Sequence, residues 1–425
     1  MKMAYYPGCS LDGSAMEYGL STKRTAEILG VELVEIEDWN CCGATSGHNT
    51  DKLLSLALPA RNLAIAEQTG LDVLAPCAAC YSRFRNTEHV VRHDPQIREK
   101  IENVIEMEYK ASNDTLSILE LLVNKLGTDK IAAKVTASLK GMKAACYYGC
   151  LLVRPREHTG FDDDEDPQSM DKVVQALGAM TVDWPHKTEC CGAALATSRP
   201  DVGKKMIYEV IKNAKAAGAE CMVTACPLCM MNLDMRQAAV EKEYKTDLQM
   251  PVYYVTELLA IACGDAPRKV GVERHFVEAE SYLASLPAKA AAIEAEEAAR
   301  AAAKAAKSPK ARKAAADEGA SAPATAETAG GPAAAAKPAA APEGASPDGD
   351  LEKKINAMIK GLQKNPEKMA LKLIADEERA AILAEIIKSD EKKVAKLAEL
   401  MISDKDKAGK AADAYVAGEL KKRAK

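Results

Sequence analysis

The chain has 425 residues, a hydrophobic fraction of 48%, only 4% aromatic residues and a formal net charge of −5. The length predicts two or three domains of ordinary size. The modest net charge and the dispersed cations exclude the basic surface of a nucleic-acid-binding protein. No apolar run is long enough to span a bilayer, and the first residues lack the apolar stretch of a signal peptide. We therefore expect a cytoplasmic protein without a membrane span.

Up to residue 265, the chain alternates helix-like and strand-like segments. Helical spacing of apolar residues occurs over residues 14–29, 53–68 and 201–217. Short strand-like runs occupy residues 31–37, 72–75 and 221–224. The cysteines lie where such a strand ends and a helix begins. This alternation predicts an α/β fold of parallel strand–helix units, in two pseudo-symmetric domains at residues 1–140 and 141–265.

The chain has 13 cysteines, all within its first 263 residues, and ten of them form two matched series. The first series is Cys9, Cys41, Cys42, Cys77 and Cys80, and the second series is Cys150, Cys190, Cys191, Cys226 and Cys229. The Cys-Cys and Cys-x-x-Cys elements are each offset by 149 residues, and the leading cysteines by 141. The pattern predicts an internal duplication. The eight extra residues of the second series fit a solvated acidic loop around residues 162–166.

The chemistry of the two series follows from their ligand type and number. Disulfides are disfavoured by a reducing compartment and by the odd cysteine count. Structural zinc, which stays an open alternative, takes four ligands, whereas each series has five thiols. A thioredoxin-like role for Cys77-x-x-Cys80 alone would leave the other repeated cysteines unexplained. Iron–sulfur ligation explains both the softness and the number of the ligands.

The spacing of both series resembles the cysteine-rich CCG domain family, and the duplication is similar to the B subunit of heterodisulfide reductase. The resemblance covers residues 1–263 and implies two non-cubane [4Fe–4S] clusters, each held by the five cysteines of one series. It implies a catalytic subunit that reduces a disulfide, of the CoM–S–S–CoB type or of another thiol or sulfur carrier. It also implies two partners, a ferredoxin-like C subunit and a flavin-bearing A subunit. The alternative is an electron-relay iron–sulfur subunit of a respiratory or bifurcating complex, without substrate chemistry of its own.

Further residues near the cysteine pairs are weaker candidates. His48 and His186 could transfer a proton to a product thiolate, or could have a supporting or surface role. Cys146, Cys221 and Cys263 lie outside both series, and we expect them to serve in packing. The sequence has no ferredoxin-type cysteine run, no Gly-x-Gly-x-x-Gly motif and no Walker A loop, so we expect no flavin or NAD site in this chain.

The composition changes after residue 265. Residues 266–349 are rich in alanine and predict a solvated helix over 288–313, followed by a disordered linker over 321–348. Residues 350–425 regain apolar positions at helical spacing and predict a small all-α domain of three to five helices. We expect this domain to be either a tethered docking module or a solubilising appendage.

Overall fold

The computed structural model describes residues 1–306 without a break. Beyond them it describes residues 359, 362, 366–374, 376–389, 393–394, 396–398, 401, 408–409, 412–413, 415–416 and 419–420. The chain forms two compact units, residues 1–321 and 322–425. The linker predicted for residues 321–348 lies outside the described residues.

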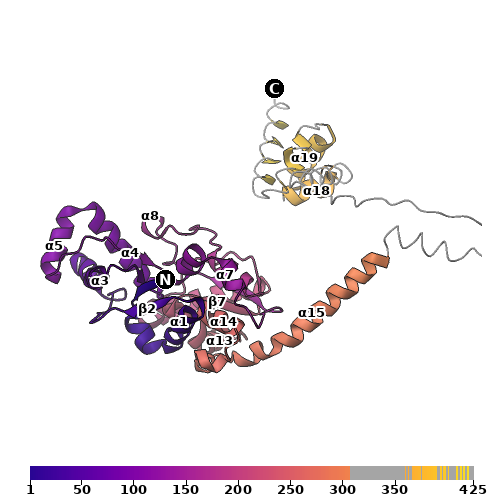
Figure 1. Ribbon diagram of the computed structural model, residues 1–425. Coiled ribbons are helices and arrows are strands. Elements are labelled where there is room, and N and C mark those ends of the chain that lie inside the picture. Colours follow the sequence, from indigo (N-terminus) through magenta and orange to yellow (C-terminus); the bar gives the residue numbers. More distant parts are fainter. Residues whose placement is uncertain are drawn as a thin grey trace, which may run out of the picture. The chain divides into compact units, whose positions relative to one another are not determined.

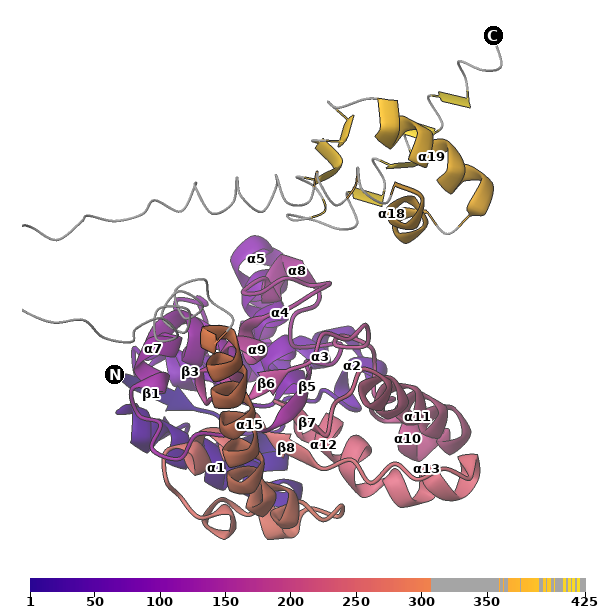
Figure 2. The ribbon, with the colours of Figure 1, turned by 90° about the vertical axis from the view of Figure 1, so that its right-hand side faces the viewer.

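The first unit contains two sheets of four parallel strands each (Figures 1 and 2). The first sheet has the order β2-β1-β3-β4, with β1 Lys2–Tyr5, β2 Glu32–Glu35, β3 Val73–Leu74 and β4 Thr115–Leu116. The second has the order β6-β5-β7-β8, with β5 Lys143–Tyr147, β6 Met180–Thr181, β7 Cys221–Thr224 and β8 Val252–Tyr254. The identical strand order confirms the duplication and the α/β fold.

The helices of the first half begin and end at recognisable signals. They are α1 Met16–Leu29, α2 Gly47–Thr50, α3 Lys52–Glu67, α4 Ala78–His93, α5 Pro95–Ile105, α6 Ile118–Glu120 and α7 Thr128–Ala132, with π-helical turns η1 Ser10–Ser14 and η2 Leu121–Leu126. The Asp51 carboxylate accepts the Leu54 N–H at the start of α3. Gly30 ends α1 at a φ of 71°, a conformation that glycine adopts without strain.

The second half repeats this layout and then continues into a long helix. Its helices are α8 Arg156–Thr159, α9 Ser169–Ala176, α10 Leu195–Ser198, α11 Pro200–Ala216, α12 Pro227–Met230, α13 Gln237–Tyr244, α14 Val255–Ala262 and α15 Glu280–Ala306. A π-helical turn, η3 Met231–Met235, and two 3₁₀ turns, η4 Pro267–Val270 and η5 Val272–Arg274, complete it. The segments predicted from periodicity are confirmed, with ends that shift by at most two residues.

Helices α1 and α14 join the two halves into a single core. The hydroxyl oxygens of Ser21 and Thr256 lie 2.7 Å apart, and the Thr25 hydroxyl donates to the Thr256 carbonyl at 3.1 Å. The Tyr18 and Tyr254 rings stack with centroids 4.1 Å apart. Because these side chains are fully buried, the two halves hold a fixed relation to each other.

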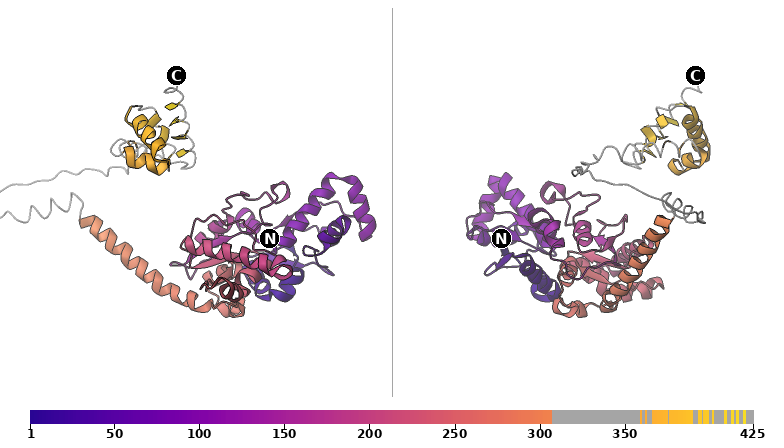
Figure 3. Two further views of the ribbon diagram at one scale, coloured as in Figure 1. Left: turned by 180° about the vertical axis from the view of Figure 1, so that it is seen from behind. Right: turned by 45° about the vertical axis from the view of Figure 1, so that its right-hand side comes forward.

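The segment after residue 264 packs against the second half. The Tyr253 hydroxyl donates to the Ala279 carbonyl at 2.6 Å, and Leu283 and Leu286 on α15 are buried. Helix α15 continues to residue 306 (Figure 3), and most of its residues from 291 to 300 are exposed. The predicted helix over 288–313 is confirmed as far as it is described, and it starts earlier. The predicted domain limits stay predictions.

The described part of the second unit is helical. Helices α18 Pro366–Leu373 and α19 Glu377–Ser389 bury apolar side chains in a small core with Leu397 and Val416. The all-α prediction for this region is confirmed for its described residues. Across the described chain, no helix combines the length and hydropathy that a bilayer crossing needs.

Candidate iron–sulfur site

The first cysteine series comes together at one edge of the first sheet. The Cys42 and Cys80 sulfurs lie 3.2 Å apart, and those of Cys9 and Cys41 lie 3.7 Å apart. Cys77 and Cys80 flank the first turn of α4 and are buried, whereas Cys9 and Cys41 are exposed. Hydrogen bonding with Cys41 and Cys80 lowers the pKa of Cys42 well below its usual value. The first site therefore has a buried end and a solvent-facing end.

The second series repeats this arrangement. The Cys191 and Cys229 sulfurs lie 3.7 Å apart. Hydrogen bonding with Cys150 lowers the pKa of Cys190 to about 6, and hydrogen bonding with Cys229 and Cys77 lowers the pKa of Cys226. Each contacting pair thus has one thiol that favours the thiolate form, which is the form that binds iron, and one whose pKa is raised, Cys42 with Cys80 and Cys190 with Cys150.

The two series lie next to each other at their Cys-x-x-Cys motifs. Hydrogen bonding with the Cys226 thiol raises the pKa of Cys77 well above its usual value. The fully buried Tyr18 hydroxyl lies within hydrogen-bonding distance of two carbonyls, that of Pro76 at 3.0 Å and that of Ala225 at 3.2 Å. These carbonyls directly precede the two cysteines. One side chain of α1 therefore holds both motifs in place.

The Cys-Cys pairs lie in irregular loops between a strand and the next helix, β2 and α2 in the first half and β6 and α10 in the second. In the second half the Gly192 N–H donates to the Cys190 sulfur at 3.4 Å. The backbone N–H groups of Gly43, Ala44 and Ala193 favour the thiolate forms of Cys41, Cys42 and Cys191 in the same way. Gly43 and Gly192 have φ angles of 71° and 91°. Consecutive N–H groups of this kind form an anion-binding nest, which stabilises thiolate and sulfide charge.

Gly8 and Gly149 let the backbone approach the buried cysteines. Each precedes the leading cysteine of its series and has a positive φ, of 63° and 68°. A Cβ atom on Gly8 would lie 3.5 Å from the Cys80 sulfur, and one on Gly149 would lie 3.1 Å from the Cys229 sulfur. A side chain at either position would therefore crowd the site.

Tyr6 and Tyr147 support the Cys-Cys loops in the same way. The Tyr6 hydroxyl donates to the Asn40 carbonyl at 2.8 Å, and the Tyr147 hydroxyl donates to the Glu189 carbonyl at 2.5 Å. Both acceptors directly precede the Cys-Cys pair. The two tyrosines are thus structural equivalents, and each ties the first strand of its sheet, or the turn after it, to the loop that carries two cysteines.

One pair of equivalent positions differs in charge. Asn232 lies three residues after Cys229, and its amide donates to the Cys191 carbonyl at 3.1 Å and to the Cys191 sulfur at 3.5 Å. Arg83 holds the corresponding place after Cys80. Its positive charge contributes to the low pKa of Cys42, after the hydrogen bonds with Cys41 and Cys80. The first site therefore has a cationic side chain, Arg83, at the position where the second site has the neutral amide of Asn232.

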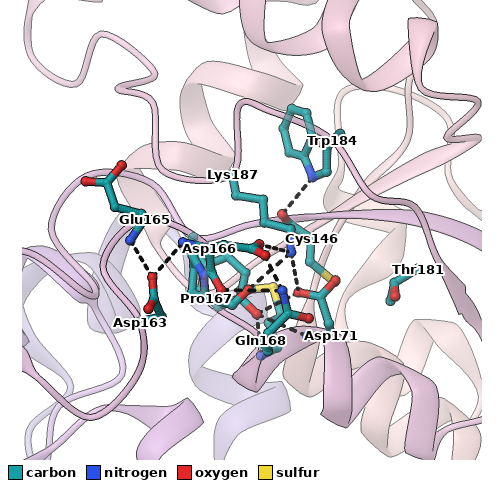
Figure 4. Close-up of polar contacts among 12 residues, drawn as sticks. Cys146, Asp163, Glu165, Asp166, Pro167, Gln168, Asp171, Thr181, Trp184 and Lys187 are labelled. Carbon is teal, nitrogen blue, oxygen red and sulfur yellow. Dashed lines mark hydrogen bonds and ion pairs between the residues drawn. The ribbon is translucent and has the colours of Figure 1, made fainter. Parts of the chain in front are cut away.

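Lys187 anchors the start of the second series (Figure 4). Its buried ammonium lies 2.9 Å from an Asp166 oxygen and 3.6 Å from an Asp171 oxygen. Its carbonyl accepts N–H groups from Tyr148 at 2.9 Å and Gly149 at 3.0 Å, directly ahead of Cys150. The acidic segment predicted as a solvated loop is therefore fastened to the site, although Asp166 itself is exposed.

The remaining predicted residues are His48, His186 and the three cysteines outside both series. His48 is exposed on α2, and His186 stacks on Trp184 with centroids 6.4 Å apart. Among the described contacts, no hydrogen bond joins either imidazole to a thiol, so their proton-transfer role stays a prediction. Cys146 and Cys221 are fully buried in β5 and β7, as expected for packing, and Cys263 is half-buried after α14.

The donor set fits an iron–sulfur group better than a single metal ion. Each series has five thiols, one more than the four ligands of a zinc site. Here the thiols contact one another in pairs, with backbone N–H donors around them, which suits an anionic group of several irons and sulfides.

The site and fold define a protein with two cysteine-rich CCG domains, and that family matches residues 3–85 and 144–234. An 8-methylmenaquinol:fumarate reductase membrane anchor subunit of Wolinella succinogenes is 33% identical, over 65% of this chain and 98% of that protein. The B subunit of a ferredoxin/F(420)H(2)-dependent CoB–CoM heterodisulfide reductase of Methanosarcina acetivorans is 30% identical, over 67% and 97%. The chain belongs to the duplicated CCG family that includes these B subunits.

Two further similarities are more distant. Lactate utilization protein A of Bacillus subtilis is 23% identical, over 61% of this chain and 99% of that protein. A hypothetical protein from Helicobacter pylori of known crystal structure has a TM-score of 0.52 and 12% identity, over 65% of this chain and 52% of that chain. At this identity the crystal structure shows the fold alone.

Proposed function

We propose that this chain is the catalytic iron–sulfur subunit of a reductase complex and that it reduces a disulfide. Each cysteine series would hold one four-iron cluster of the non-cubane type. The single observation that carries the proposal is the position of the Tyr18 hydroxyl, which lies 3.0 Å from the Pro76 carbonyl and 3.2 Å from the Ala225 carbonyl and so places the two Cys-x-x-Cys motifs side by side. Because the two sites share this boundary, two one-electron groups could act on one substrate.

The reaction sets the demands on the chain. Cleavage of RSSR to two RSH takes two electrons and two protons. When bound, the two clusters supply the electrons one at a time. The ten thiolates hold them, the N–H nests stabilise their negative charge, and Tyr18 keeps the two motifs at a fixed separation. The exposed Cys9 and Cys41 leave one end of the first site open to a substrate or partner.

The electrons would come from other polypeptides of the complex. We propose a ferredoxin-like C subunit as the immediate donor and a flavin-bearing A subunit behind it. Support comes from the names of the relatives, several of which are subunits of reductases. The substrate would be a CoM–S–S–CoB-type disulfide or the disulfide of another thiol or sulfur carrier.

A second candidate is an electron-relay subunit of a quinol-linked respiratory complex. It is favoured by the Wolinella succinogenes relative, whose name includes 8-methylmenaquinol:fumarate reductase and which matches over 98% of its length. In that function the clusters pass electrons between a quinol and another protein of the complex, without disulfide chemistry.

Disulfide-dependent oxidation of a reduced viologen dye tests the leading candidate. The full chain is reconstituted anaerobically and supplied with CoM–S–S–CoB or with simple disulfides. We expect turnover that is lost in Cys77→Ser and in Cys226→Ser and kept in Cys263→Ser, which changes a cysteine outside both series. Wild-type rates in both Cys77→Ser and Cys226→Ser would contradict disulfide cleavage by two clusters acting together. The electron-relay function would then be the remaining candidate.

A further inference from the structure

Cys150, the leading cysteine of the second series, has no helix directly behind it. In the first half, Cys9 lies at the start of the π-helical turn η1, and α1 follows from Met16. In the second half, residues 150–155 are irregular, and the next helix, α8, begins at Arg156. A segment from elsewhere in the chain therefore has to fix the position of the Cys150 thiol.

The Lys187 backbone fixes the two residues ahead of Cys150. Its carbonyl accepts the N–H of Tyr148 at 2.9 Å and the N–H of Gly149 at 3.0 Å. The first half cannot form the same pair of hydrogen bonds. The offset of 141 residues between the leading cysteines puts Pro7, which has no N–H, at the position of Tyr148. This support therefore belongs to the second series.

The Lys187 side chain reaches the same tyrosine through Asp171. The Lys187 ammonium lies 3.6 Å from an Asp171 oxygen (Figure 4), and the Tyr148 hydroxyl donates to that oxygen at 2.7 Å. The N–H groups of Met170 and Asp171 donate to the Tyr148 hydroxyl oxygen at 2.7 and 3.1 Å. Lys187, Asp171 and Tyr148 thus form a closed ring of polar contacts, and all three residues are buried.

Opposite charges keep the ammonium in this buried place. It lies 2.9 Å from an Asp166 oxygen and donates to the Pro167 carbonyl at 3.2 Å. A buried charge is costly unless it is paired, so these partners decide where the Lys187 backbone lies. The position 149 residues earlier is occupied by Asp38, whose side chain is 85% exposed. The first half therefore has no buried cation at this position.

The neighbouring Cys-Cys loop has a support of its own. The Tyr147 hydroxyl donates to the Glu189 carbonyl, directly ahead of Cys190. This contact does not involve the Lys187 side chain. Loss of the Lys187 ammonium should therefore affect Cys150 more than the other four thiols of the second series.

We propose that Lys187 is a positioning residue for the second iron–sulfur site, an inference that rests on the proposed function. Its ammonium, bound by Asp166 and Asp171, fixes the Lys187 backbone. The Lys187 carbonyl then fixes the turn that presents the Cys150 thiol. Without the ammonium, the second site keeps four thiols in place and loses its hold on the fifth.

Iron release and cysteine alkylation test the proposal in the full chain with its clusters, under anaerobic conditions. Lys187→Met keeps the carbonyl and removes the ammonium. The control is Lys289→Met, which removes the cation of another ion pair in this unit, that with Glu220. We expect Lys187→Met to release about half of its iron to a chelator, roughly tenfold faster than wild type. Mass spectrometry should then find Cys150 alkylated and the first series protected, with wild-type behaviour in the control.

Electron paramagnetic resonance shows whether the change is confined to one cluster. We expect the signal of one reduced cluster to change in Lys187→Met and the other to stay as in wild type. Circular dichroism shows whether the variant is folded. If it is not, Asp166→Asn at an exposed position takes its place, with a smaller increase in the rate of iron release.

Two results would overturn the role of Lys187 alone. One is about eight irons in wild type with unchanged iron release and a protected Cys150 in Lys187→Met. The other is equal alkylation of both series in that variant, which would show a general loss of stability. A wild-type chain with about four irons would contradict the two-cluster function, and this inference with it.

Discussion

Among individual residues, Gly149 and Gly70 form a matched pair for testing the cysteine sites. Their φ angles are nearly equal, at 68° and 67°, so a new side chain is strained equally at both. A Cβ atom on Gly149 would meet the Cys229 sulfur at 3.1 Å, whereas one on Gly70 would meet no described atom within 4 Å. We expect Gly149→Ala to lower iron per chain by about half and Gly70→Ala to leave it unchanged, as measured by iron and sulfide analysis. An equal loss of iron in both variants would mean that backbone strain, and not contact with the Cys229 sulfur, lowers the iron content.

Arg83 makes the two sites electrostatically unequal. Because the cation stabilises added negative charge, we expect Arg83→Gln to lower the reduction potential of the cluster proposed for the first series. A unit charge within about 10 Å at an effective dielectric constant near 20 changes a potential by roughly 50–100 mV. Electron paramagnetic resonance during redox titration measures the shift, and Arg83→Lys should preserve the wild-type value. Unchanged potentials in Arg83→Gln would show that the guanidinium does not act on the site.

Glu88 predicts a specific pH dependence of stability. Its side chain is buried between Arg85 and Thr115, and burial raises its pKa from 4.5 to about 7. Between these two values the folded state binds more protons than the unfolded state, so stability falls as the pH rises through this window. We expect the free energy of unfolding of Glu88→Gln to change less with pH between these two values than that of wild type, as measured by urea unfolding at several pH values. The same pH dependence of the unfolding free energy in variant and wild type would contradict a raised pKa of Glu88.

Among the elements, α1 has the largest role in joining the halves. Tyr18→Phe would leave the carbonyls of Pro76 and Ala225 without their shared donor, at a cost of about 1–3 kcal/mol of unfolding free energy. Tyr5→Phe is the control, because the Tyr5 hydroxyl is buried without a partner in the described structure. We expect thermal unfolding to show a clear loss for the first variant and none for the second. Similar losses in both would point to packing instead of hydrogen bonding.

The elements themselves could be predicted because their signals are local. Residues 201–217 show helical spacing, and α11 occupies nearly the same range. The loop geometry around Cys41 and Cys190 could not be predicted, because it depends on tyrosines from another strand. The fixed offset between the series was sufficient to predict the duplicated fold, and the structure adds the Tyr18 hydroxyl that links the two Cys-x-x-Cys motifs.

At the scale of the whole molecule, the missed residues are those that depend on distant contacts. Tyr18 meets Ala225 across 207 positions, and His275 meets Glu257 from a segment placed outside both predicted CCG domains. Neither has a sequence signal of its own. The proton-transfer role of His48 and His186 rests on their positions near the Cys-Cys pairs in the sequence and stays a prediction.

The packing of residues 267–289 leads to a prediction about truncation. A chain ending at residue 321 keeps Leu283, Leu286 and the contact between Lys289 and Glu220, whereas a chain ending at 265 loses them. We expect the first truncation to keep the iron content and melting temperature of the cysteine domains, and the second to lower the melting temperature by several degrees. Equal melting temperatures would show that this segment adds nothing to the core.

Iron and acid-labile sulfide per chain, determined after strictly anaerobic purification, test the central claim most directly. Two four-iron clusters predict about eight of each. About four of each would mean that one series is empty and would contradict the paired site at Cys77 and Cys226. Zinc without sulfide would contradict the redox function as a whole.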